Sequence, residues 1–301
     1  MADVSIITVN YNTSDYLKKC VNSVIRFTEG LDYQIYIVDN NSRDRNELSS
    51  HFGSVPSVNI IYNPENKGFG AACNAGAASS EGPYLLFLNP DIEVTDNSIK
   101  KMYDYMEENK SAGLCSALLT DSEGKPDYTF NYFPSYSWEF REAFGLEVNR
   151  IINKLLSRPE ISGNAAFEVD WNHGACLLVR REIFEEIKGF DENFFLYYED
   201  TDLQFRIKKN NHKIFCLPFL RMIHAQRSSV RSDSGRRIYL YYMHLSRMLF
   251  LRKNYGAMRR NIIRSFFITG MFLRLMFKSS VKRINLTRYQ IKMILSIYLY
   301  R

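Results

Sequence analysis

Two acidic positions follow apolar segments of the chain, and their side chains are suited to binding a metal ion. Asp39 follows the run 33–38, and the turn Asn89-Pro90-Asp91 follows the run 84–88. A single aspartate after a strand usually caps the helix that comes next. Two such sites, one of them with polar groups two residues apart, instead favour a hard cation such as Mg²⁺ or Mn²⁺ that carries a diphosphate.

His224 is suited to metal coordination, and the acidic run 199–202 is suited to proton transfer. His224 follows an apolar run at 214–218. An isolated histidine is usually structural, but here it would complete a set of oxygen and nitrogen ligands that suits Mn²⁺. The acidic run 199–202, Glu-Asp-Thr-Asp, begins a predicted helix after several aromatic residues. Such acids stabilise the positive end of a helix dipole, and a carboxylate between aromatic side chains would also serve as a general base.

The loop 66–70, Asn-Lys-Gly-Phe-Gly, would let a phosphate approach the backbone and the start of the next helix. Gly68 and Gly70, with an aspartate about twenty residues later, also resemble a dinucleotide-binding fingerprint. Cys73 stands where that fingerprint requires Gly or Ala, and the loop follows the third predicted strand rather than the first. A dehydrogenase is therefore disfavoured.

Alternating strands and helices would place these residues along one edge of a sheet. Apolar, β-branched runs predict strands, and apolar residues at helical spacing predict the helices between them. The predicted strands are 4–9, 33–38, 58–62, 84–88, 169–180 and 214–218, and the predicted helices are 15–27, 45–52, 70–79, 97–109, 182–188 and 198–210. This order predicts an α/β, Rossmann-like, doubly wound and mostly parallel sheet. Ligands of such sheets bind outside the carboxyl ends of the strands, where Asp39 and Asp91 lie.

The C-terminal part differs from the rest in its charge. The net charge of the chain is +6, but residues 221–301 hold 18 Lys and Arg against one acidic residue. Helices are predicted at 236–255, at 258–278 and from 287 to the end. The most apolar run, 262–277, is interrupted by two arginines and is shorter than the roughly 20 residues that span a bilayer. We therefore predict a basic, apolar helical region that lies on an anionic membrane surface.

Composition also limits the compartment and the partners. The five cysteines lie far apart without a CxxC pair, so we expect reduced, mostly buried thiols. The N-terminal residues lack the basic start and apolar run of a secretory signal. We expect a cytoplasmic protein, bound peripherally to the cytoplasmic face of the membrane. No nucleic-acid partner is expected, because no RNP-type or zinc-finger signature accompanies the basic region.

Taken in order, these segments resemble the family 2 glycosyltransferases of the GT-A fold, over about residues 3–230. The resemblance rests on Ser5-Ile-Ile-Thr-Val-Asn-Tyr-Asn12, Val38-Asp-Asn40, the loop 66–70 with Asn74, Leu88-Asn-Pro-Asp91, Trp171-Asn-His-Gly-Ala175, Gly189-Phe-Asp-Glu192 and Phe195-Leu-Tyr-Tyr-Glu-Asp-Thr-Asp202. It implies a catalytic domain at 1–230 and an accessory helical region at 231–301. It also implies inverting transfer of a sugar from a nucleoside diphosphate, with a divalent metal, Mn²⁺ or Mg²⁺, as cofactor.

The same resemblance implies roles for individual residues. On the donor side, Thr8, Asn10 and Asp39 would hold the nucleoside, Lys67 and Asn74 would lie near the ribose or the sugar, and Gly68, Asn89 and Asp91 would also bind the donor. On the acceptor side they are Trp171, His173 and Gly174. Asp91 and His224 would bind the metal. Asn89 stands where many relatives have the first Asp of a DxD motif. Asp200 would be the catalytic base, with Glu199 beside it in support.

Within the family, the segments 169–171, 174–181 and 195–202 look most like rhamnosyltransferases of cell-surface polysaccharide assembly. This resemblance implies dTDP-L-rhamnose as the donor and a hydroxyl of a lipid-linked saccharide as the acceptor. Three alternatives stay open: a family 2 enzyme with a UDP-sugar donor, a polyanion-binding protein without catalysis, and a degenerate transferase that binds sugar without turnover. The aromatic stretch 128–161, with a predicted helix at 148–156, would be an insertion that faces the acceptor.

Overall fold

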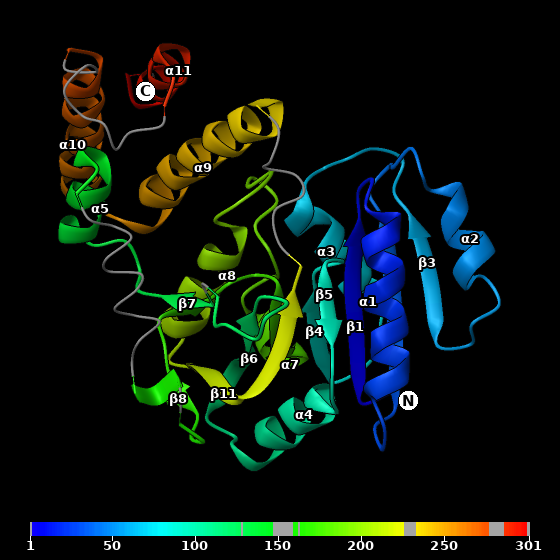
Figure 1. Cartoon of the computed structure of the whole chain (residues 1–301). Coiled ribbons are helices and arrows are strands. Elements are labelled where there is room, and N and C mark those ends of the chain that lie inside the picture. The colour runs from blue at the N-terminus through cyan, green and yellow to red at the C-terminus, as the bar shows by residue number, and fades with distance from the viewer. Residues whose placement is uncertain are drawn as a thin grey trace. The chain divides into compact units, whose positions relative to one another are not determined.

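The computed structural model describes residues 2–127, 129–146, 159–161, 163–225, 233–276 and 286–299. The chain forms two compact units, whose elements Figure 1 colours by their position in the sequence. The sheet unit comprises residues 1–131, 156–195 and 199–226, and the helical unit comprises residues 132–155, 196–198 and 227–301. The helical unit thus includes two internal segments that no single boundary in the sequence would assign to it.

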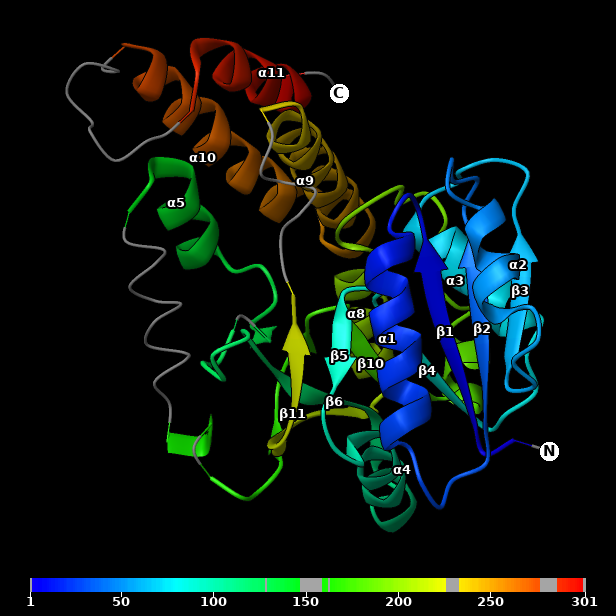
Figure 2. The same ribbon diagram turned by 45° about the vertical axis from the view of Figure 1, so that its right-hand side comes forward.

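Alternating strands and helices build the first half of the sheet unit (Figure 2). They are β1 (Val4–Asn10), α1 (Ser14–Phe27), β2 (Tyr33–Asp39), α2 (Asn46–Phe52), β3 (Val58–Tyr62), α3 (Phe69–Ala78) and β4 (Tyr84–Leu88). These strands are parallel and lie in the order β3-β2-β1-β4. Every residue of β1 and β4 is buried, as in strands with helices on both faces. The elements predicted here are confirmed to within one residue at each end.

The second half of the sheet unit adds antiparallel strands. Its elements are β5 (Ile92–Val94), α4 (Ser98–Glu108), β6 (Ala112–Thr120), β7 (Phe130–Asn131), β8 (Phe167–Glu168), β9 (Trp171–Asn172), β10 (Cys176–Arg180), α7 (Arg181–Glu186), α8 (Glu199–Lys209) and β11 (Lys213–His224). The order continues β4-β10-β6-β11-β5, with β10 antiparallel to both neighbours and β11 parallel to β6. The predicted α/β class is therefore confirmed, with a mixed sheet.

Two predicted strands of this half are wrong in extent, and one observed strand has no counterpart in the prediction. The strand predicted at 169–180 is interrupted at 173–175, so β9 and β10 are separate. β11 continues past Pro218 to His224, because a register shift after Leu217 accommodates the proline. The sequence pattern does not predict β6, although all nine of its residues are buried.

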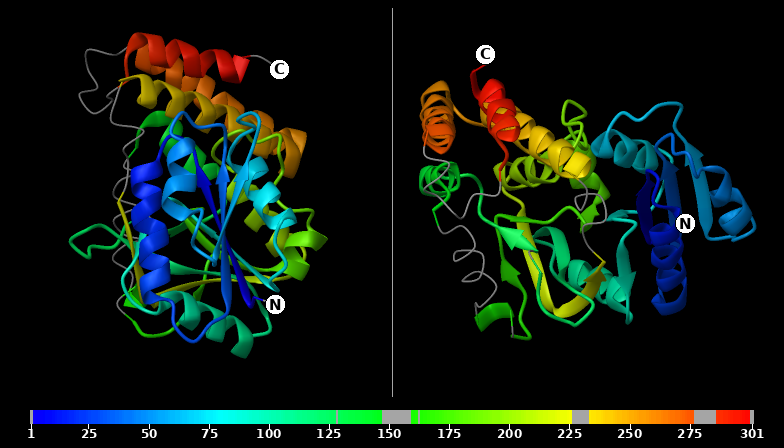
Figure 3. Two further views of the ribbon diagram at one scale, coloured as in Figure 1. Left: turned by 90° about the vertical axis from the view of Figure 1, so that its right-hand side faces the viewer. Right: turned by 45° about the horizontal axis from the view of Figure 1, so that its top comes forward.

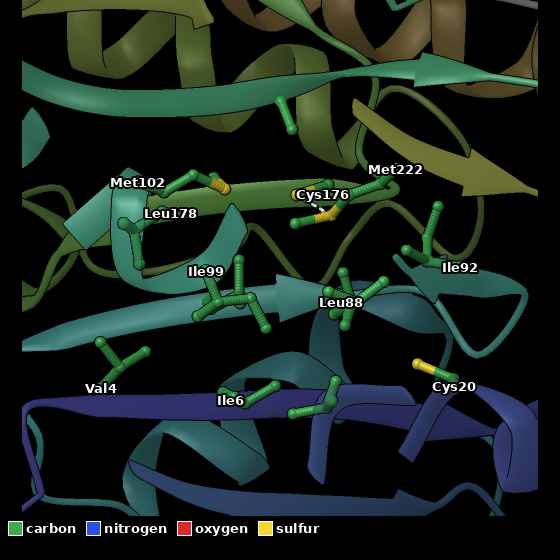
Figure 4. Close-up of a cluster of buried hydrophobic side chains, with 14 of the residues drawn as sticks. Val4, Ile6, Cys20, Leu88, Ile92, Ile99, Met102, Cys176, Leu178 and Met222 are labelled. Carbon is green, nitrogen blue, oxygen red and sulfur yellow. Dashed lines mark hydrogen bonds between the residues drawn. The ribbon is translucent and has the colours of Figure 1, made fainter. Parts of the chain in front are cut away.

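The core of the sheet unit depends on the alternation of side chains along β1. Val4 and Ile6 belong to the cluster that also contains Leu88 and residues of α1 and α4 (Figure 4). Ile7 faces α3 instead, where a Cβ at Gly76 would lie only 2.6 Å from it. The helix packs this closely on the strand because residue 76 has no side chain. All five cysteines are buried and unpaired, as predicted.

The described part of the helical unit contains α5 (Tyr136–Phe144), α9 (Asp233–Asn254), α10 (Ala257–Met276) and α11 (Arg288–Leu299), which can be followed in Figure 3. His244 Nδ1 and Tyr298 Oη, 2.9 Å apart, join α9 to α11, and Tyr298 stacks on Phe267 of α10. None of the helices in the described ranges combines the length and the apolar character needed to cross a membrane. The helix predicted at 148–156 lies outside the described residues.

A buried ion cluster in the helical unit centres on Arg247 of α9, which is 3% exposed. Its guanidinium donates to Glu142 Oε1 at 2.6 Å and to Tyr198 Oη at 2.8 Å, and it lies 3.6 Å from Glu139 Oε2. Burial raises the pKa of Glu139 to about 7, although the charge of Arg247 acts to lower it. Removing one partner from such a cluster leaves a buried charge without compensation.

The same helix holds the short segment 196–198. Ser246 Oγ donates to the Leu196 carbonyl at 2.8 Å, and the rings of Tyr197 and Tyr239 lie edge to face. Tyr197 and Tyr198 have φ angles of 65° and 66°. Two successive aromatic residues in the left-handed region are strained, so the contacts with α9 must hold them there. The next residue in the sequence is Glu199, the first of α8.

We expect Arg247→Met to lower the free energy of unfolding by about 3–5 kcal/mol, because Glu139 and Glu142 lose their buried counter-charge. Urea unfolding followed by circular dichroism measures this change. Arg252→Met removes an exposed arginine from the same helix and should cost less than about 0.5 kcal/mol. Equal losses in the two variants would contradict a structural role for the buried cluster.

Candidate active site

The carboxyl ends of β1 and β2 carry the first group of predicted site residues. Asn10 and Asp39 end these strands and are paired in register. Asn10 Nδ2 donates to Asp39 Oδ1 at 3.0 Å, and both side chains are fully buried. Thr8 lies two residues earlier on β1, and its buried Oγ1 has no hydrogen-bond partner in the described part of the chain. A buried hydroxyl of this kind is costly unless a ligand or water satisfies it.

Residues just after β2 extend this group, and they are absent from the sequence-based site. Asn10 Nδ2 lies 3.0 Å from Ser42 Oγ and 3.2 Å from Asp44 Oδ1. Burial acts to raise the pKa of Asp44, but hydrogen bonds from the backbone of α1 and from Asn10 lower it below its ordinary value. The signal for these residues is the uninterrupted polar run 40–46 directly after a buried strand.

The loop between β3 and α3 packs its backbone against the segment that precedes α8. Gly68 has a φ of 99°, and a Cβ there would overlap the carbonyl oxygen of Phe195, so only glycine fits. The Phe69 amide donates to that oxygen at 3.1 Å. Lys67 is 61% exposed and lies 3.4 Å from Glu65. The loop therefore exposes a lysine beside a backbone that Gly68 keeps close to residue 195.

Asn74 of α3, predicted to lie near the donor sugar, binds a loop of the protein. Its Nδ2 donates to the Phe190 carbonyl at 2.9 Å and to Glu192 Oε1 at 3.0 Å. Its Oδ1 accepts from the Phe190 amide at 2.9 Å. These bonds hold residues 189–192 in place, and contact of Asn74 with a sugar stays a prediction.

The turn after β4 and the end of β11 bring Asp91 and His224 together. β5 and β11 pair so that Ile92 is opposite His224. His224 Nε2 lies 3.4 Å from Asp91 Oδ2, and its Nδ1 lies 3.7 Å from Asp127 Oδ2. Burial alone would lower the pKa of His224, but the two carboxylates raise it to about 9. Asp127 is a residue that sequence reasoning misses, because no spacing pattern relates it to His224.

This arrangement fits one side of a metal site. Asp91 offers a carboxylate oxygen and His224 a ring nitrogen, and Asn89 Oδ1 is buried with no hydrogen-bond partner among the described residues. Such oxygen and nitrogen donors suit Mn²⁺. In the ranges that the structure describes, no group of three or more His, Cys, Asp or Glu side chains is placed to hold a metal. A metal here would take its other ligands from substrate or water.

Asp200 lies in the first turn of α8, where backbone amides fix both of its oxygens. Oδ2 accepts from the Gly174 amide at 2.8 Å, and Oδ1 accepts from the Thr201 amide at 2.7 Å. Glu199 beside it is buried, and burial together with the charge of Asp200 raises the pKa of Glu199 well above its ordinary value. This shift disfavours the ionised form of Glu199.

The turn between β9 and β10 places the predicted acceptor-side residues beside Asp200 and His224. A Cβ at Gly174 would lie 2.9 Å from Asp200 Oδ2, closer than atoms of this kind approach. The His173 ring lies near that of His224, with centroids 5.5 Å apart. Burial is the main cause that lowers the pKa of His173, and His224 adds to the effect. Trp171 precedes the turn on β9 and pairs with β7.

The structure places most of the predicted site residues in three groups. Asp91, His173, Gly174, Asp200 and His224 form one cluster through the contacts given above. Thr8, Asn10 and Asp39 lie at the ends of β1 and β2, and Lys67, Gly68 and Asn74 lie along the loop and helix that border residues 190–195. Asn89 and Glu199 adjoin the cluster, and Trp171 borders it. Their individual roles stay predictions.

The chain matches a known protein family and resembles related sequences. Residues 5–188 match the family described as Glycosyl transferase family 2. The chain is 29% identical over 239 residues to rhamnosyltransferase WbbL of Escherichia coli (strain K12), covering 76% of this chain and 86% of that protein. It is 26% identical over 298 residues to N-acetylglucosaminyl-diphospho-decaprenol L-rhamnosyltransferase of Mycobacterium tuberculosis (strain ATCC 25618 / H37Rv), covering 94% and 96%.

Solved structures show the same fold. The mannosyltransferase PcManGT from Pyrobaculum calidifontis, in complex with GDP-Man and Mn²⁺, superposes with a TM-score of 0.61 at 11% identity and covers 99% of this chain and 86% of its own. GalNAc-T7 with UDP, GalNAc and Mn²⁺ gives a TM-score of 0.60 at 16% identity, covering 93% of this chain and 58% of its own. The predicted GT-A architecture is therefore confirmed.

We expect Gly174→Ala to lower the catalytic turnover by about 100-fold, because the added methyl group displaces the Asp200 carboxylate. Nucleotide affinity, measured by titration calorimetry, should be nearly unchanged, since Asn10 and Asp39 are untouched. Gly256→Ala is the matched control, because a Cβ there has open space around it. Wild-type turnover in Gly174→Ala would show that the position of Asp200 is not critical.

Proposed function

This chain belongs to glycosyl transferase family 2 and is a nucleotide-sugar glycosyltransferase; we propose that it transfers L-rhamnose from dTDP-L-rhamnose to a hydroxyl of a lipid-linked saccharide. The cluster of Asp91, His224 and Asp200 carries the proposal, because it joins a metal-type site to a carboxylate fixed by backbone amides. The names of two relatives support rhamnose as the sugar, and one of them supports a diphospho-linked lipid saccharide as the acceptor.

The nucleoside of the donor would bind at the ends of β1 and β2. The Asp39 carboxylate accepts hydrogen bonds from Asn10 Nδ2 and from the Ser42 amide. An ionised carboxylate has about four acceptor positions, so Asp39 can also accept the imide N–H of a thymine or uracil ring. The Thr8 hydroxyl, which lacks a partner among the described residues, offers the nucleoside another hydrogen bond. Lys67 would lie near the ribose or the sugar.

Asp91 and His224 would hold the divalent metal, Mn²⁺ or Mg²⁺, with the Asn89 amide oxygen close by. A metal bound there neutralises the charge that grows on the departing diphosphate. Two solved structures with this fold contain Mn²⁺, which supports a metal of this class. The neutral Asn89, in place of a second carboxylate, leaves Asp91 as the charged ligand of the turn.

Asp200 would act as the general base. It would remove the proton of the acceptor hydroxyl while the hydroxyl oxygen attacks the anomeric carbon and the nucleoside diphosphate departs. The amides of Gly174 and Thr201 orient the carboxylate before the acceptor arrives, which lowers the entropic cost of reaching the reactive geometry. This single displacement inverts the anomeric configuration and needs no covalent enzyme intermediate. His173 and Trp171 would line the acceptor side.

The helical unit would bring the enzyme to a lipid-linked acceptor. Thirteen of the seventeen exposed large apolar side chains in the described ranges belong to this unit. Residues 221–301 also contain 18 of the 39 Lys and Arg residues and a single acidic residue. Exposed apolar and basic side chains together bind anionic membrane surfaces. The enzyme would therefore work at the cytoplasmic face of the membrane.

Release of dTDP from dTDP-L-rhamnose should require both a lipid diphosphate-linked N-acetylglucosamine acceptor and Mn²⁺ or Mg²⁺, and EDTA should abolish it. Asp200→Asn should lower kcat by about 1,000-fold while dTDP affinity is kept, because only the proton acceptor is lost. Asp91→Ala should weaken metal-dependent binding of dTDP. Coupled nucleotide-release kinetics and titration calorimetry measure these effects.

Asp104→Asn is the control for these variants, since Asp104 is a half-exposed residue of α4 paired with Lys100. It should keep wild-type kinetics. A parallel panel of UDP-sugars identifies the donor, and turnover of one of them without turnover of dTDP-L-rhamnose would favour the alternative donor. Full activity of Asp200→Asn would rule out Asp200 as the base.

A further inference from the structure

A cavity of about 920 Å³ opens among α9, α10 and α11 within the helical unit. Three arginines line it, Arg252 from α9 and Arg260 and Arg264 from α10. Leu245, Leu249 and Ile297 contribute apolar surface from α9 and α11. None of the lining residues in the described part of the chain is acidic. The cavity therefore combines three positive charges with an apolar wall.

The arginines of the cavity differ from the buried arginine of the same unit. Arg247 is neutralised by Glu139 and Glu142, whereas no ion pair joins Arg252, Arg260 or Arg264 to a carboxylate in the described ranges. Arg264 donates to the carbonyl oxygens of Tyr298 and Leu299, so it caps the last turn of α11.

The other two arginines of the cavity, Arg252 and Arg260, have N–H donors that no acceptor among the described residues occupies. Among the described residues, the one side-chain hydrogen bond of the Arg260 guanidinium joins its Nε to Asn261 Oδ1 at 3.4 Å, and Arg252 is exposed. Each guanidinium has five N–H donors in a planar fork that matches phosphate oxygens, and it stays charged at every physiological pH. The cavity thus keeps two guanidinium groups available for an anion.

We propose that this cavity binds one anionic phospholipid of the bilayer. Its phosphate would lie between Arg252 and Arg260, and the start of its acyl chains would lie against Leu245, Leu249 and Ile297. The charge and the apolar wall together select an amphiphile over a free anion, because a free phosphate would leave the apolar surface unused.

The surroundings of the cavity favour a lipid of the bilayer as its occupant. Nine exposed large apolar side chains lie on the same three helices: Ile238, Tyr241, Leu245, Met258, Phe272, Leu273, Met276, Tyr289 and Leu299. A protein surface of this kind is stable in contact with the headgroup and acyl boundary of a membrane. This inference rests on the proposed membrane association and adds to it a single saturable site.

The test uses the full chain and a short-chain phosphatidylglycerol kept below its micelle concentration, so that no membrane surface is present. Titration calorimetry should show saturable binding of one lipid per chain. Arg252→Gln combined with Arg260→Gln should weaken this binding by about ten-fold or more, because charge-assisted hydrogen bonds to the phosphate are lost. Leu245→Gln should weaken binding of the lipid but not of glycerol phosphate.

The matched control combines Arg288→Gln with Lys292→Gln, which removes the same charge from exposed positions of α11 outside the cavity lining. It should change binding of the short-chain lipid by less than about two-fold. Equal weakening in both double variants, or no saturable binding by the wild type, would overturn the site. Preference for a short polyprenyl diphosphate over the phospholipid would overturn the assigned occupant. Because no donor sugar is present, these outcomes are independent of the proposed transfer reaction.

Discussion

The hydrogen bond from the Gly174 amide to the Asp200 carboxylate is the contact on which the candidate site depends. It exists because the chain interrupts its strand at 173–175, and because residue 174 has no side chain to keep α8 away. The same turn sets His173 beside His224, which in turn lies next to Asp91. One short turn therefore contacts both Asp200 and the His224–Asp91 pair. Within the helical unit, Ser246 of α9 donates a hydrogen bond to the Leu196 carbonyl of the segment 196–198, which precedes α8 in the sequence.

The candidate site contains several carboxylates, so an anionic ligand would bind there together with a cation. Asp91, Asp127 and Asp200 are three carboxylates close to two histidines, and burial together with the charge of Asp200 raises the pKa of Glu199, which disfavours a further negative charge there. Burial acts to lower the pKa of His224, but the pKa is raised because a proton on the ring compensates the carboxylates of Asp127 and Asp91. A nucleoside diphosphate would add negative charge to this region, and it binds favourably only with a divalent cation or with nearby Lys and Arg side chains.

The bounds of a strand are predicted best from the sequence where the local residue pattern and the tertiary environment favour the same structure. The strands at 58–62 and 84–88 end where a run of apolar residues meets a polar turn, and the structure ends them at the same residues. The sequence pattern does not predict β6 because small residues and leucines fill it and Thr120 at its end is its single β-branched residue. Burial between β10 and β11 makes it a strand. Pro218 is typical of the end of a strand, but an irregularity in the strand pairing accommodates it, so β11 continues to His224. Asp127 is not predicted because only the fold brings its turn to His224, whereas Asp91 and His224 follow predicted strands and Asp200 lies at the start of a predicted helix.

The most direct test of the account is pulsed electron paramagnetic resonance of Mn²⁺ bound together with dTDP. If Asp91 and His224 hold the metal that carries the diphosphate, the spectrum of the wild type should contain couplings to ³¹P and to a histidine ¹⁴N. The ¹⁴N coupling should vanish in His224→Ala and persist in Asp200→Asn, which alters the base and not the metal ligands. A ³¹P coupling without any ¹⁴N coupling in the wild type, or no Mn²⁺ bound in the presence of dTDP, would contradict the proposed site.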